Sequence, residues 1–308
     1  MINQSTKLRG HDSLHATMAL ARRVERAEIE FCALAGSTAV SGGVPKSPST
    51  AVPLQREGID ILDAAGGRAL FSRPGSPLNK VLGLGLQGRV ADHDLDRIEA
   101  FYRARSAPTQ IELCPLAYGD LAARLCARGY VLEAFENELG RATAPPPAVA
   151  TTTAAAEAGP QEAAAVTLAE PDQGDLWTRV VSEGFVAFEP LVGGAPDGKP
   201  VTLEQMIDMM SQFSHPNIRR YLAWIDGEPT GGGAAWAHEG VLGIFGTSTL
   251  PGFRRRGVQT AITIQAMNDA RGMADLAIAT TAPGSTSQRT FERLGFQVLY
   301  TRAVFVKS

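Results

Sequence analysis

The feature that most constrains the fold is a segment rich in Pro, Ala and Thr near the middle of the 308-residue chain. Residues 142–165 read ATAPPPAVATTTAAAEAGPQEAAA, with three consecutive prolines and almost no large apolar side chain. Such a segment buries too little apolar surface to offset the entropy lost on ordering, which predicts an extended, partly stiff linker. We therefore expect one domain in residues 1–141 and a second in residues 166–308. Residues 36–53, rich in Gly, Ser and Pro, predict a loop.

The composition favours a globular chain without a polyanionic or membrane partner. The hydrophobic fraction of 44% suffices for two cores, and the formal net charge of -3 gives no general reason to expect nucleic acid or an anionic membrane. No apolar run approaches the roughly 18 residues that span a bilayer. Residues 1–10 are polar and lack the apolar core of a signal peptide. The expected location is the cytoplasm.

The cysteines and histidines are too scattered for a disulfide framework or a metal site. An odd number of cysteines without CxxC spacing favours a reducing compartment. No histidine lies with cysteine or carboxylate at metal-ligand spacing, so no metal is expected. The residues concerned are Cys32, Cys114, Cys126, His11, His15, His93, His215 and His238.

The second half of the chain alternates helical and strand periodicity in a defined order. Two helices come first, over residues 175–185 and 202–213, and Thr202 with Gln205 forms a capping-box pattern. Asp226-Gly227 is a hairpin signal between two apolar strands. The elements that follow are predicted to be three strands, a helix, a strand, a helix and a final strand or strand pair, over residues 221–225, 230–237, 241–250, 258–271, 276–280, 287–294 and 296–306.

One strand-to-helix junction in this half is suited to an anion. Residues 250–261 read LPGFRRRGVQTA, and a helix is expected to begin after Gly257. A helix N-terminus leaves about four backbone N–H groups unpaired and carries a partial positive charge. Gly257 lets the backbone approach a ligand closely, and Arg254, Arg255 and Arg256 add full charges. These groups together fit a diphosphate, whereas the run taken alone equally describes an exposed basic turn.

At this junction the sequence resembles the GNAT acetyltransferase superfamily, which marks its acetyl-CoA site with the pattern (Q/R)-x-x-G-x-(G/A). Arg254 to Gln259 fit every position but the last, where Gln259 stands in place of Gly or Ala. Residues 293–296, RLGF, are similar to the LGF ending of the family's fourth helix. The resemblance covers roughly residues 166–308 and implies that acetyl-CoA is the cosubstrate.

The resemblance also implies which residues hold the cofactor. The strand over residues 244–250 would pair with the pantetheine arm and present the acetyl carbonyl. Ser285 or Ser287 would supply a hydroxyl where the family often has Asn, although either serine also suits a helix cap. The implied cofactor-binding residues are Thr247, Thr249, Leu250, Arg254, Arg255, Arg256, Gly257, Val258, Gln259, Thr260, Ser285 and Ser287.

The groups that would move protons are left open. The family often has a Tyr as general acid where this chain has Phe291, which has no proton to give, and Tyr300 is an alternative donor. A lysine-like amine, with a pKa of about 10.4, must lose a proton before it attacks, so a base or water chain is expected. Glu239, Glu183 and Glu189 are the candidate bases, and each also fits a solvated carboxylate.

The first half repeats the pattern of the second at low identity. Setting residue n against residue n + 166 aligns residues 101–130 with residues 267–296 without a gap. The corresponding elements of the first half are two strands and a helix, expected over residues 80–86, 110–113 and 120–128.

The repeated half has lost the basic junction. Residues 88–93, GRVADH, take the place of residues 254–259 and keep one arginine. Asp92 and Asp94 would repel a diphosphate, and Asp92 is expected to be the N-cap of a helix that ends at Arg105. We predict a degenerate GNAT-like half that binds no acetyl-CoA, covers the active half and shapes its acceptor cleft. An unrelated α/β domain is the alternative.

The expected fold is therefore α/β, with two tandem GNAT-like units, each a twisted mixed sheet flanked by helices. The expected activity is acetyl-CoA-dependent N-acetylation of a small-molecule amine, such as a metabolite, an amino acid or an antibiotic-like compound. Residues 166–308 contain no cysteine, which favours direct transfer over a cysteine relay. The alternatives are a protein N-acetyltransferase and a non-catalytic acyl-CoA-binding regulatory protein, and a homodimer stays open. A P-loop enzyme is disfavoured because no Gly-Lys-Ser/Thr follows the loop.

Overall fold

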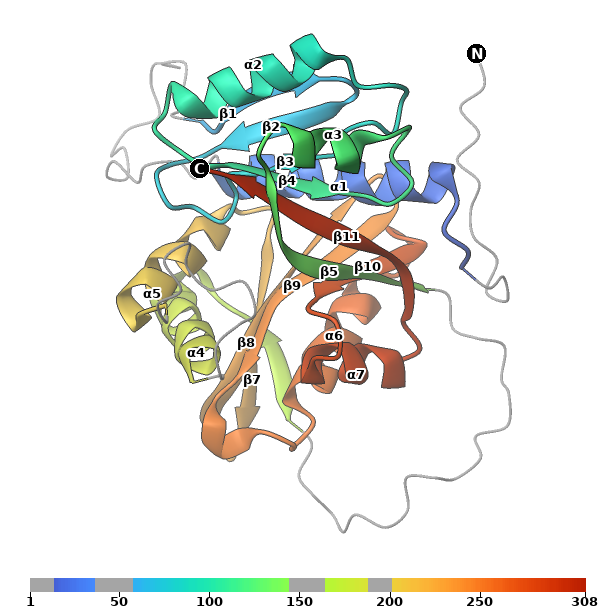
Figure 1. Cartoon of the computed structure of the whole chain (residues 1–308). Helices are drawn as coiled ribbons and strands as arrows, with labels where there is room; N and C mark the ends of the chain where they lie inside the picture. Colours follow the sequence, from blue (N-terminus) through green and yellow to red (C-terminus); the bar gives the residue numbers. More distant parts are fainter. Residues whose placement is uncertain (1–13, 37–57, 144–163, 188–200) are drawn as a thin grey trace, which may run out of the picture.

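The strands of the chain form one continuous mixed sheet in the computed structural model, which describes residues 14–36, 58–143, 164–187 and 201–308 (Figure 1). The sheet has 11 strands in the order β1-β2-β3-β4-β11-β5-β10-β9-β8-β7-β6. Two pairs are parallel, β3 with β4 and β9 with β10, and the other pairs are antiparallel. The α/β class is confirmed, but the prediction of a separate sheet for each half is wrong. Most of the predicted linker and of the loop over residues 36–53 lies outside the described residues.

The second half follows the predicted order of elements, preceded by one strand that the pattern did not predict. Gln205 N donates a hydrogen bond of 3.2 Å to Thr202 Oγ1, and Thr202 N donates one of 2.9 Å to Gln205 Oε1, which confirms the capping box. The additional strand is β6, which pairs with β7. The elements are β6 (Ala165–Leu168), α4 (Gly174–Val186), α5 (Leu203–Ser211), β7 (Arg219–Ile225), β8 (Glu228–His238), β9 (Val241–Thr249), α6 (Val258–Asp269), β10 (Leu276–Thr281), α7 (Thr286–Arg293) and β11 (Gln297–Lys307).

The first half has the same succession of strand, helix, strand, helix and long strand from β3 onward. Its elements are α1 (Met18–Gly36), β1 (Asp60–Ala64), β2 (Gly67–Phe71), β3 (Val81–Leu82), α2 (Asp92–Arg103), β4 (Thr109–Leu113), α3 (Leu121–Ala127) and β5 (Val131–Ala142). Pairing in β3 ends at Leu82, earlier than predicted, because Gly83 and Gly85 adopt φ values of 71° and 76°, outside the strand region.

The N-cap of α2 is Ala91, so the prediction that Asp92 caps this helix is wrong by one position. The carboxylate that reaches back to the helix end is that of Asp94, whose Oδ2 accepts a 3.4 Å hydrogen bond from Ala91 N. Asp92 is the first helical residue and is free to make a different contact, described below.

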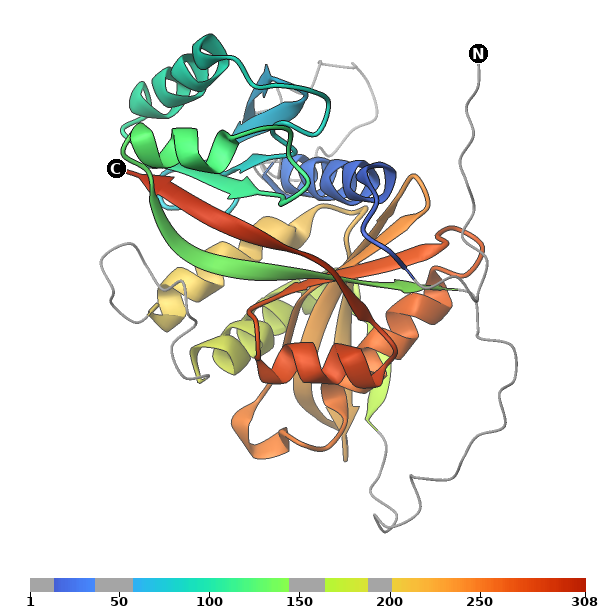
Figure 2. The same ribbon diagram turned by 45° about the vertical axis from the view of Figure 1, so that its right-hand side comes forward.

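The two halves exchange their last strands. The first half's β5 lies between β10 and β11 of the second half, and β11 lies between β5 and β4 of the first (Figure 2). Each half thus completes the other's part of the sheet, which makes the two halves a single folding unit. Arg302 and Glu136 are directly opposite each other in the β5–β11 pair, and the two are related by the same 166-residue offset that relates the halves in sequence.

The helices cover the sheet on both faces. Val258, Ile262 and Ala266 of α6 pack on the second half's strands in one core, and Trp177 and Val181 of α4 pack on the opposite face in another. The helix α1 belongs to the first half in sequence but contacts β8 and β9 as well as β2 and β3. It therefore bridges the halves on the face of α4 and α5.

Candidate active site

The N-terminus of α6 is preceded by an exposed glycine whose conformation few other residues tolerate. Gly257 is the N-cap, with φ 77° and ψ 8°, and no side chain caps the helix. A Cβ at this position would meet no atom within 4 Å, so open space lies in front of the backbone. Arg255, two residues earlier, also has a positive φ of 63°. The predicted loop therefore presents backbone and basic side chains at the positive end of a helix dipole.

The three arginines of this loop differ in how firmly they are held. Arg254 makes long contacts to two backbone carbonyls, 3.5 Å to Thr249 O and 3.4 Å to Gly184 O. Arg256 lies over the ring of Phe253, with 5.5 Å between the guanidinium carbon and the ring centroid. Its ion pair with Asp226 is long, at 4.0 Å. Arg255 is exposed. The long ion pair of Arg256 and the exposure of Arg255 leave these two guanidinium groups able to turn to an anion.

The residue that departs from the family pattern ties α6 to α7. Gln259 Nε2 donates a 2.9 Å hydrogen bond to Ser287 Oγ. Ser285 is the N-cap of α7, because its Oγ accepts a 3.0 Å hydrogen bond from Gln288 N. Three of the predicted cofactor-binding residues thus have structural contacts of their own, and the Gln259–Ser287 hydrogen bond links the first turns of α6 and α7.

The strands β9 and β10 pair only in their first three residues, and both strands extend beyond the last pair. Their parallel register runs from Val241 and Leu276 to Gly243 and Ile278, whereas β9 extends to Thr249 and β10 to Thr281. Gly246, with φ 59°, accompanies a register shift in the β8–β9 pair at this level. Thr247 and Thr249 lie on the unpaired stretch, half-buried. The free strand edges end at the α6 loop, so an extended ligand arm could hydrogen-bond to them.

The candidate bases lie in different environments. Glu239 is in the β8–β9 turn with φ 44°, its side chain is 60% exposed, and its nearest ion-pair partner is Arg26 at 3.7 Å. Glu183 is half-buried on α4. Glu189 lies outside the described residues.

The aromatic candidates are buried. The hydroxyl of Tyr300 donates a 2.9 Å hydrogen bond to Glu25 Oε1, and burial raises the pKa of Tyr300 well above its usual range. Phe291 is 2% exposed and packs edge-on against Phe296, with 5.0 Å between ring centroids. The Tyr300 hydroxyl therefore faces a carboxylate of the first half, and Phe291 packs in the hydrophobic core.

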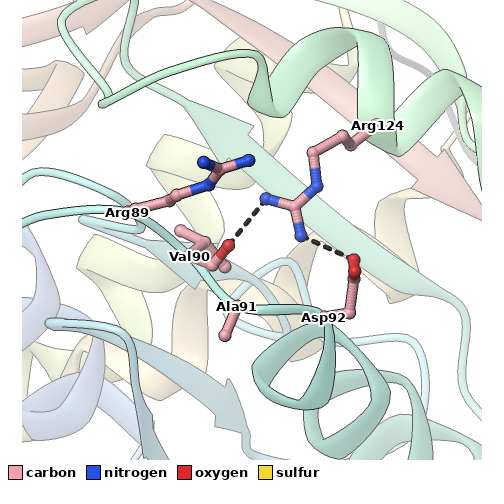
Figure 3. A pocket seen from close by; sticks show the side chains of 5 residues that line it. All are labelled: Arg89, Val90, Ala91, Asp92 and Arg124. Atoms are coloured by element: carbon pink, nitrogen blue, oxygen red, sulfur yellow. Dashed lines mark hydrogen bonds and ion pairs between the residues drawn. The ribbon is translucent and has the colours of Figure 1, made fainter.

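The corresponding junction in the first half is closed electrostatically, because its Arg124 is already paired with a carboxylate of the same chain (Figure 3). Arg124 Nη1 donates a 2.6 Å hydrogen bond to Val90 O, and its Nη2 donates one of 2.6 Å to Asp92 Oδ1. This contact with Arg124, and then the charge of Arg128, lower the pKa of the Asp92 carboxyl. A cavity of about 350 Å³ lies here, lined by Arg89, Val90, Ala91, Asp92 and Arg124.

A buried ionic cluster, which the sequence analysis did not predict, lies where the exchanged strands β5 and β11 pair. Arg302 is fully buried, with 2.8 Å from its Nε to Glu25 Oε1, and 2.5 Å and 2.9 Å from its Nη1 to Glu28 and Glu138. Glu112 lies 3.5 Å from the same Nη1 and 2.8 Å from Lys80 Nζ. The carboxylates of this cluster come from α1, β4 and β5, so only the fold brings them to Arg302.

No helix in the described part of the chain is both long and apolar enough to cross a membrane. Within residues 14–36, 58–143, 164–187 and 201–308, no group of three or more His, Cys, Asp or Glu side chains is arranged to hold a metal ion.

Comparisons with known proteins agree with this architecture. The model of the "Acetyltransferase (GNAT) family" matches residues 189–296. A solved GCN5-related N-acetyltransferase from Kribbella flavida superposes with a TM-score of 0.61 at 17% identity, over 94% of this chain and 95% of its own. A functionally unknown conserved protein from Staphylococcus epidermidis gives 0.55 at 12% identity, over 80% and 92%. A GCN5-related N-acetyltransferase from Sphaerobacter thermophilus gives 0.51 at 14% identity, over 95% and 94%.

No curated protein matches the sequence. The solved structures establish that the described parts of both halves have a fold found in GCN5-related proteins. The match over residues 189–296 supports the GNAT acetyltransferase family for the half of the chain that carries the α6 loop.

Proposed function

We propose that this protein is an acetyl-CoA-dependent N-acetyltransferase whose second half binds the cofactor and transfers its acetyl group directly to a small-molecule amine. The observation that carries the proposal is the open N-terminus of α6: an exposed, left-handed Gly257 without a side-chain cap, preceded by three arginines. Oriented N–H groups and guanidinium groups converge there, which is the arrangement that a diphosphate requires.

The residues present fit the cofactor in this half. The α6 loop, Arg254 to Thr260, would hold the diphosphate, and Thr247, Thr249 and Leu250 would accompany the pantetheine arm along the unpaired edge of β9. Ser287, bonded to Gln259, would lie at the α7 side of the same opening. When bound, acetyl-CoA supplies a thioester carbonyl that an amine can attack.

Direct transfer and a small acceptor are supported by the residues of this half. All three cysteines precede residue 127, so no thiol of the second half can carry the acetyl group. Buried carboxylates on the α1 face of the sheet, such as Glu138, favour a cationic amine over an anionic acceptor. Among the candidate bases, Glu239 is largely exposed beside Arg26 and Glu183 is half-buried on α4.

The first half is proposed to be a repeat that binds no acetyl-CoA. In place of the three arginines it has Gly88, Arg89 and Val90. Asp92, which corresponds to Val258, places its carboxylate on Arg124 at the start of α2. A diphosphate would have to compete with the Asp92 carboxylate for the guanidinium group of Arg124. The proposed boundaries are 1–141 for this half, 142–165 for the linker and 166–308 for the active half.

The experiment that tests the proposal is isothermal titration of acetyl-CoA into the wild-type protein and the Arg256→Ala variant. We expect one site per chain, weakened at least about tenfold in the variant, since a charge-assisted contact to phosphate is lost. Arg271→Ala, an exposed arginine beyond α6, is the matched control. Two sites would show that the first half also binds, and unchanged affinity in Arg256→Ala would remove the diphosphate assignment.

One observation favours a second candidate, a non-catalytic acyl-CoA-binding regulatory protein. Phe291 stands where the family often has a proton-donating Tyr, and it is buried against Phe296. Tight acetyl-CoA binding without thiol release in the presence of any primary amine would favour this candidate.

A further inference from the structure

The side chain of Thr280 is exposed in the stretch of β10 that β9 no longer pairs. The last register pair of these strands is Gly243 with Ile278, two residues before Thr280. Leu276, Ala277, Ile278 and Ala279 are all buried, and Thr280 is exposed. Ile278 packs with Leu20, Ala21 and Val24 of α1. Because strand side chains alternate, Thr280 lies on the same face as Ile278, toward α1.

The hydroxyl of Thr280 is hydrogen-bonded to Glu138, a carboxylate of the first half. Thr280 Oγ1 donates a 2.6 Å hydrogen bond to Glu138 Oε1. Glu138 lies on the exchanged strand β5 and is 0% exposed. Its second oxygen, Oε2, is also buried and accepts no hydrogen bond from the described residues. Thr280 is therefore the exposed end of a contact whose other end is a buried carboxyl with one unsatisfied oxygen.

The surroundings of Glu138 hold more acid than base. The cations facing it are Arg302 on β11, 2.9 Å from Oε1, and Lys80 beyond it. The other groups around it are Glu25 and Glu28 on α1, Glu112 on β4, Glu136 on β5 and the Tyr300 hydroxyl on β11. Two cations cannot neutralise five closely spaced carboxylates, so the cluster retains protons at neutral pH.

Two of these carboxyls have strongly displaced pKa values. Burial is the main cause that raises the pKa of Glu138 to about 8, against the opposing charge of Arg302. The neighbouring charge of Glu112 and then burial raise the pKa of Glu136 to about 7. A carboxyl that titrates near neutrality can both take up and release a proton during turnover.

We propose that Thr280 and Glu138 form the proton relay of the acetyl transfer, so that the first half supplies the proton acceptor for the site of the second. The inference rests on the proposed function and adds the residues that deprotonate the amine. Thr280 would contact the acceptor, and Glu138 would act through Thr280.

Each proton that leaves the amine has a defined acceptor in the relay. An ammonium N–H proton passes to Thr280 Oγ1 while the Thr280 proton passes to Glu138 Oε1, which leaves a neutral amine and a neutral Glu138. The amine nitrogen then attacks the thioester carbon, a C–N bond forms and the C–S bond breaks. The second N–H proton goes to the departing thiolate, which leaves as a thiol. Glu138 finally returns its proton to solvent through Thr280.

The relay also defines the acceptor by its chemistry. An ammonium group is drawn to the acidic cluster, and it loses its proton only where that proton has an acceptor within hydrogen-bond reach. We therefore expect a primary amine that is charged in solution and small enough to reach Thr280 from the α1 face.

The test compares wild type with Glu138→Gln, Thr280→Val and Thr280→Ser, with Glu133→Gln, exposed on the same strand, as control. The first measurement needs neither cofactor nor acceptor. Infrared difference spectra between pH 6 and pH 10 should show a carboxylic acid band that disappears through about pH 8. The component that disappears near pH 8 should be absent from Glu138→Gln, which keeps only the Glu136 component near pH 7, and it should be shifted in Thr280→Val.

The second measurement is thiol release from acetyl-CoA with 1,4-diaminobutane as amine, as a function of pH. Wild-type kcat/KM should rise through about pH 8, since Glu138 must be ionised to accept the proton. Glu138→Gln and Thr280→Val should lower the rate by about 10²- to 10⁴-fold and abolish the rise. Thr280→Ser, which keeps the hydroxyl, should retain both the rate and the rise, and Glu133→Gln should resemble wild type.

The outcomes separate this inference from the proposed function. If acetyl-CoA binds but Glu138→Gln keeps the wild-type pH profile, the relay is wrong and the cofactor site stands. Acetyl-CoA bound without thiol release from the diamine at any pH overturns the relay and favours the non-catalytic acyl-CoA-binding candidate, while the cofactor site stands. If acetyl-CoA does not bind, the proposed function fails and the relay with it. A wild-type infrared spectrum identical to that of Glu138→Gln would show that Glu138 does not titrate between pH 6 and pH 10, which overturns the relay.

Discussion

The helices α2 and α6, which the proposed repeat makes equivalent, begin in opposite electrostatic states. At α6 the backbone turns through a left-handed glycine into open space, and the nearest acid, Asp226, lies 4.0 Å from Arg256. At α2 the N-cap is Ala91 in extended conformation, and Asp92 lies 2.6 Å from Arg124 (Figure 3). A helix N-terminus in this fold is therefore available to a ligand only when the chain supplies no carboxylate of its own.

The comparison extends to what each half gives the other. The first half has a closed junction, yet it contributes α1 and β5 to the face on which the proposed acceptor site lies. The second half contributes β11, and with it Arg302, to the strands of the first. Each half therefore needs the other for the sheet, because the last strand of each half is paired with the strands of the other.

The largest expected effect follows from removing the cation at the crossing of the exchanged strands. Arg302→Ala leaves Glu25, Glu28 and Glu138 buried without their shared partner. Breaking a buried charge pair by removing one member costs about 3 to 5 kcal/mol of unfolding free energy. Chemical denaturation should show this loss, whereas Arg271→Ala, an exposed arginine, should leave the midpoint unchanged. An unchanged midpoint in Arg302→Ala would mean that the halves are joined by packing alone.

The next effect compares one glycine at each junction. Gly257→Val places a β-branched side chain at φ 77°, in front of the amides that would face the diphosphate. We expect acetyl-CoA affinity to fall about 10- to 100-fold, or about 1.4 to 2.8 kcal/mol by calorimetry. Gly88→Val is the matched control, since Gly88 also has a positive φ, 146°, and open space, but lies before α2. Equal losses in both variants would point to a general effect of strain and not to a local site.

The local signals of the second half were predictable from sequence because each depends on a few adjacent residues. Local side-chain and backbone chemistry alone determines three of these conformations: the capping box at Thr202, the Asp226-Gly227 turn and the glycine before α6. The same holds for the basic loop, where charge and helix start are adjacent in the chain. These features would be recognised in any context.

The strand exchange was not predictable, because β5 and β11 are each the last strand of their own half and either could have closed that half. Which strand pairs with β10 depends on contacts more than 130 residues apart, such as Thr280 with Glu138. The buried cluster was missed for a related reason. Glu138 and Arg302 occupy the polar positions of alternating strands, and only the placement of α1 over them makes those positions interior.

The smallest effect would sharpen the comparison by opening the closed junction. Asp92→Asn removes the carboxylate that neutralises Arg124 and leaves Arg89 and Arg124 at the start of α2. The Asp92 side chain is 76% exposed, so loss of its solvent-screened ion pair should change stability little and leave the fold intact. We expect affinity for inorganic pyrophosphate to increase, by up to about tenfold, or about 1.4 kcal/mol.

The measurement is calorimetry in a Gly257→Val background, where the α6 site is already weakened. Arg124→Ala added to Asp92→Asn should remove the gain, because it takes away the guanidinium that was released. If Asp92→Asn gains nothing, the α2 junction is closed by its backbone geometry and not by its carboxylate. In that case Ala91, which replaces a left-handed glycine with an extended N-cap, would be the change that separates the two halves.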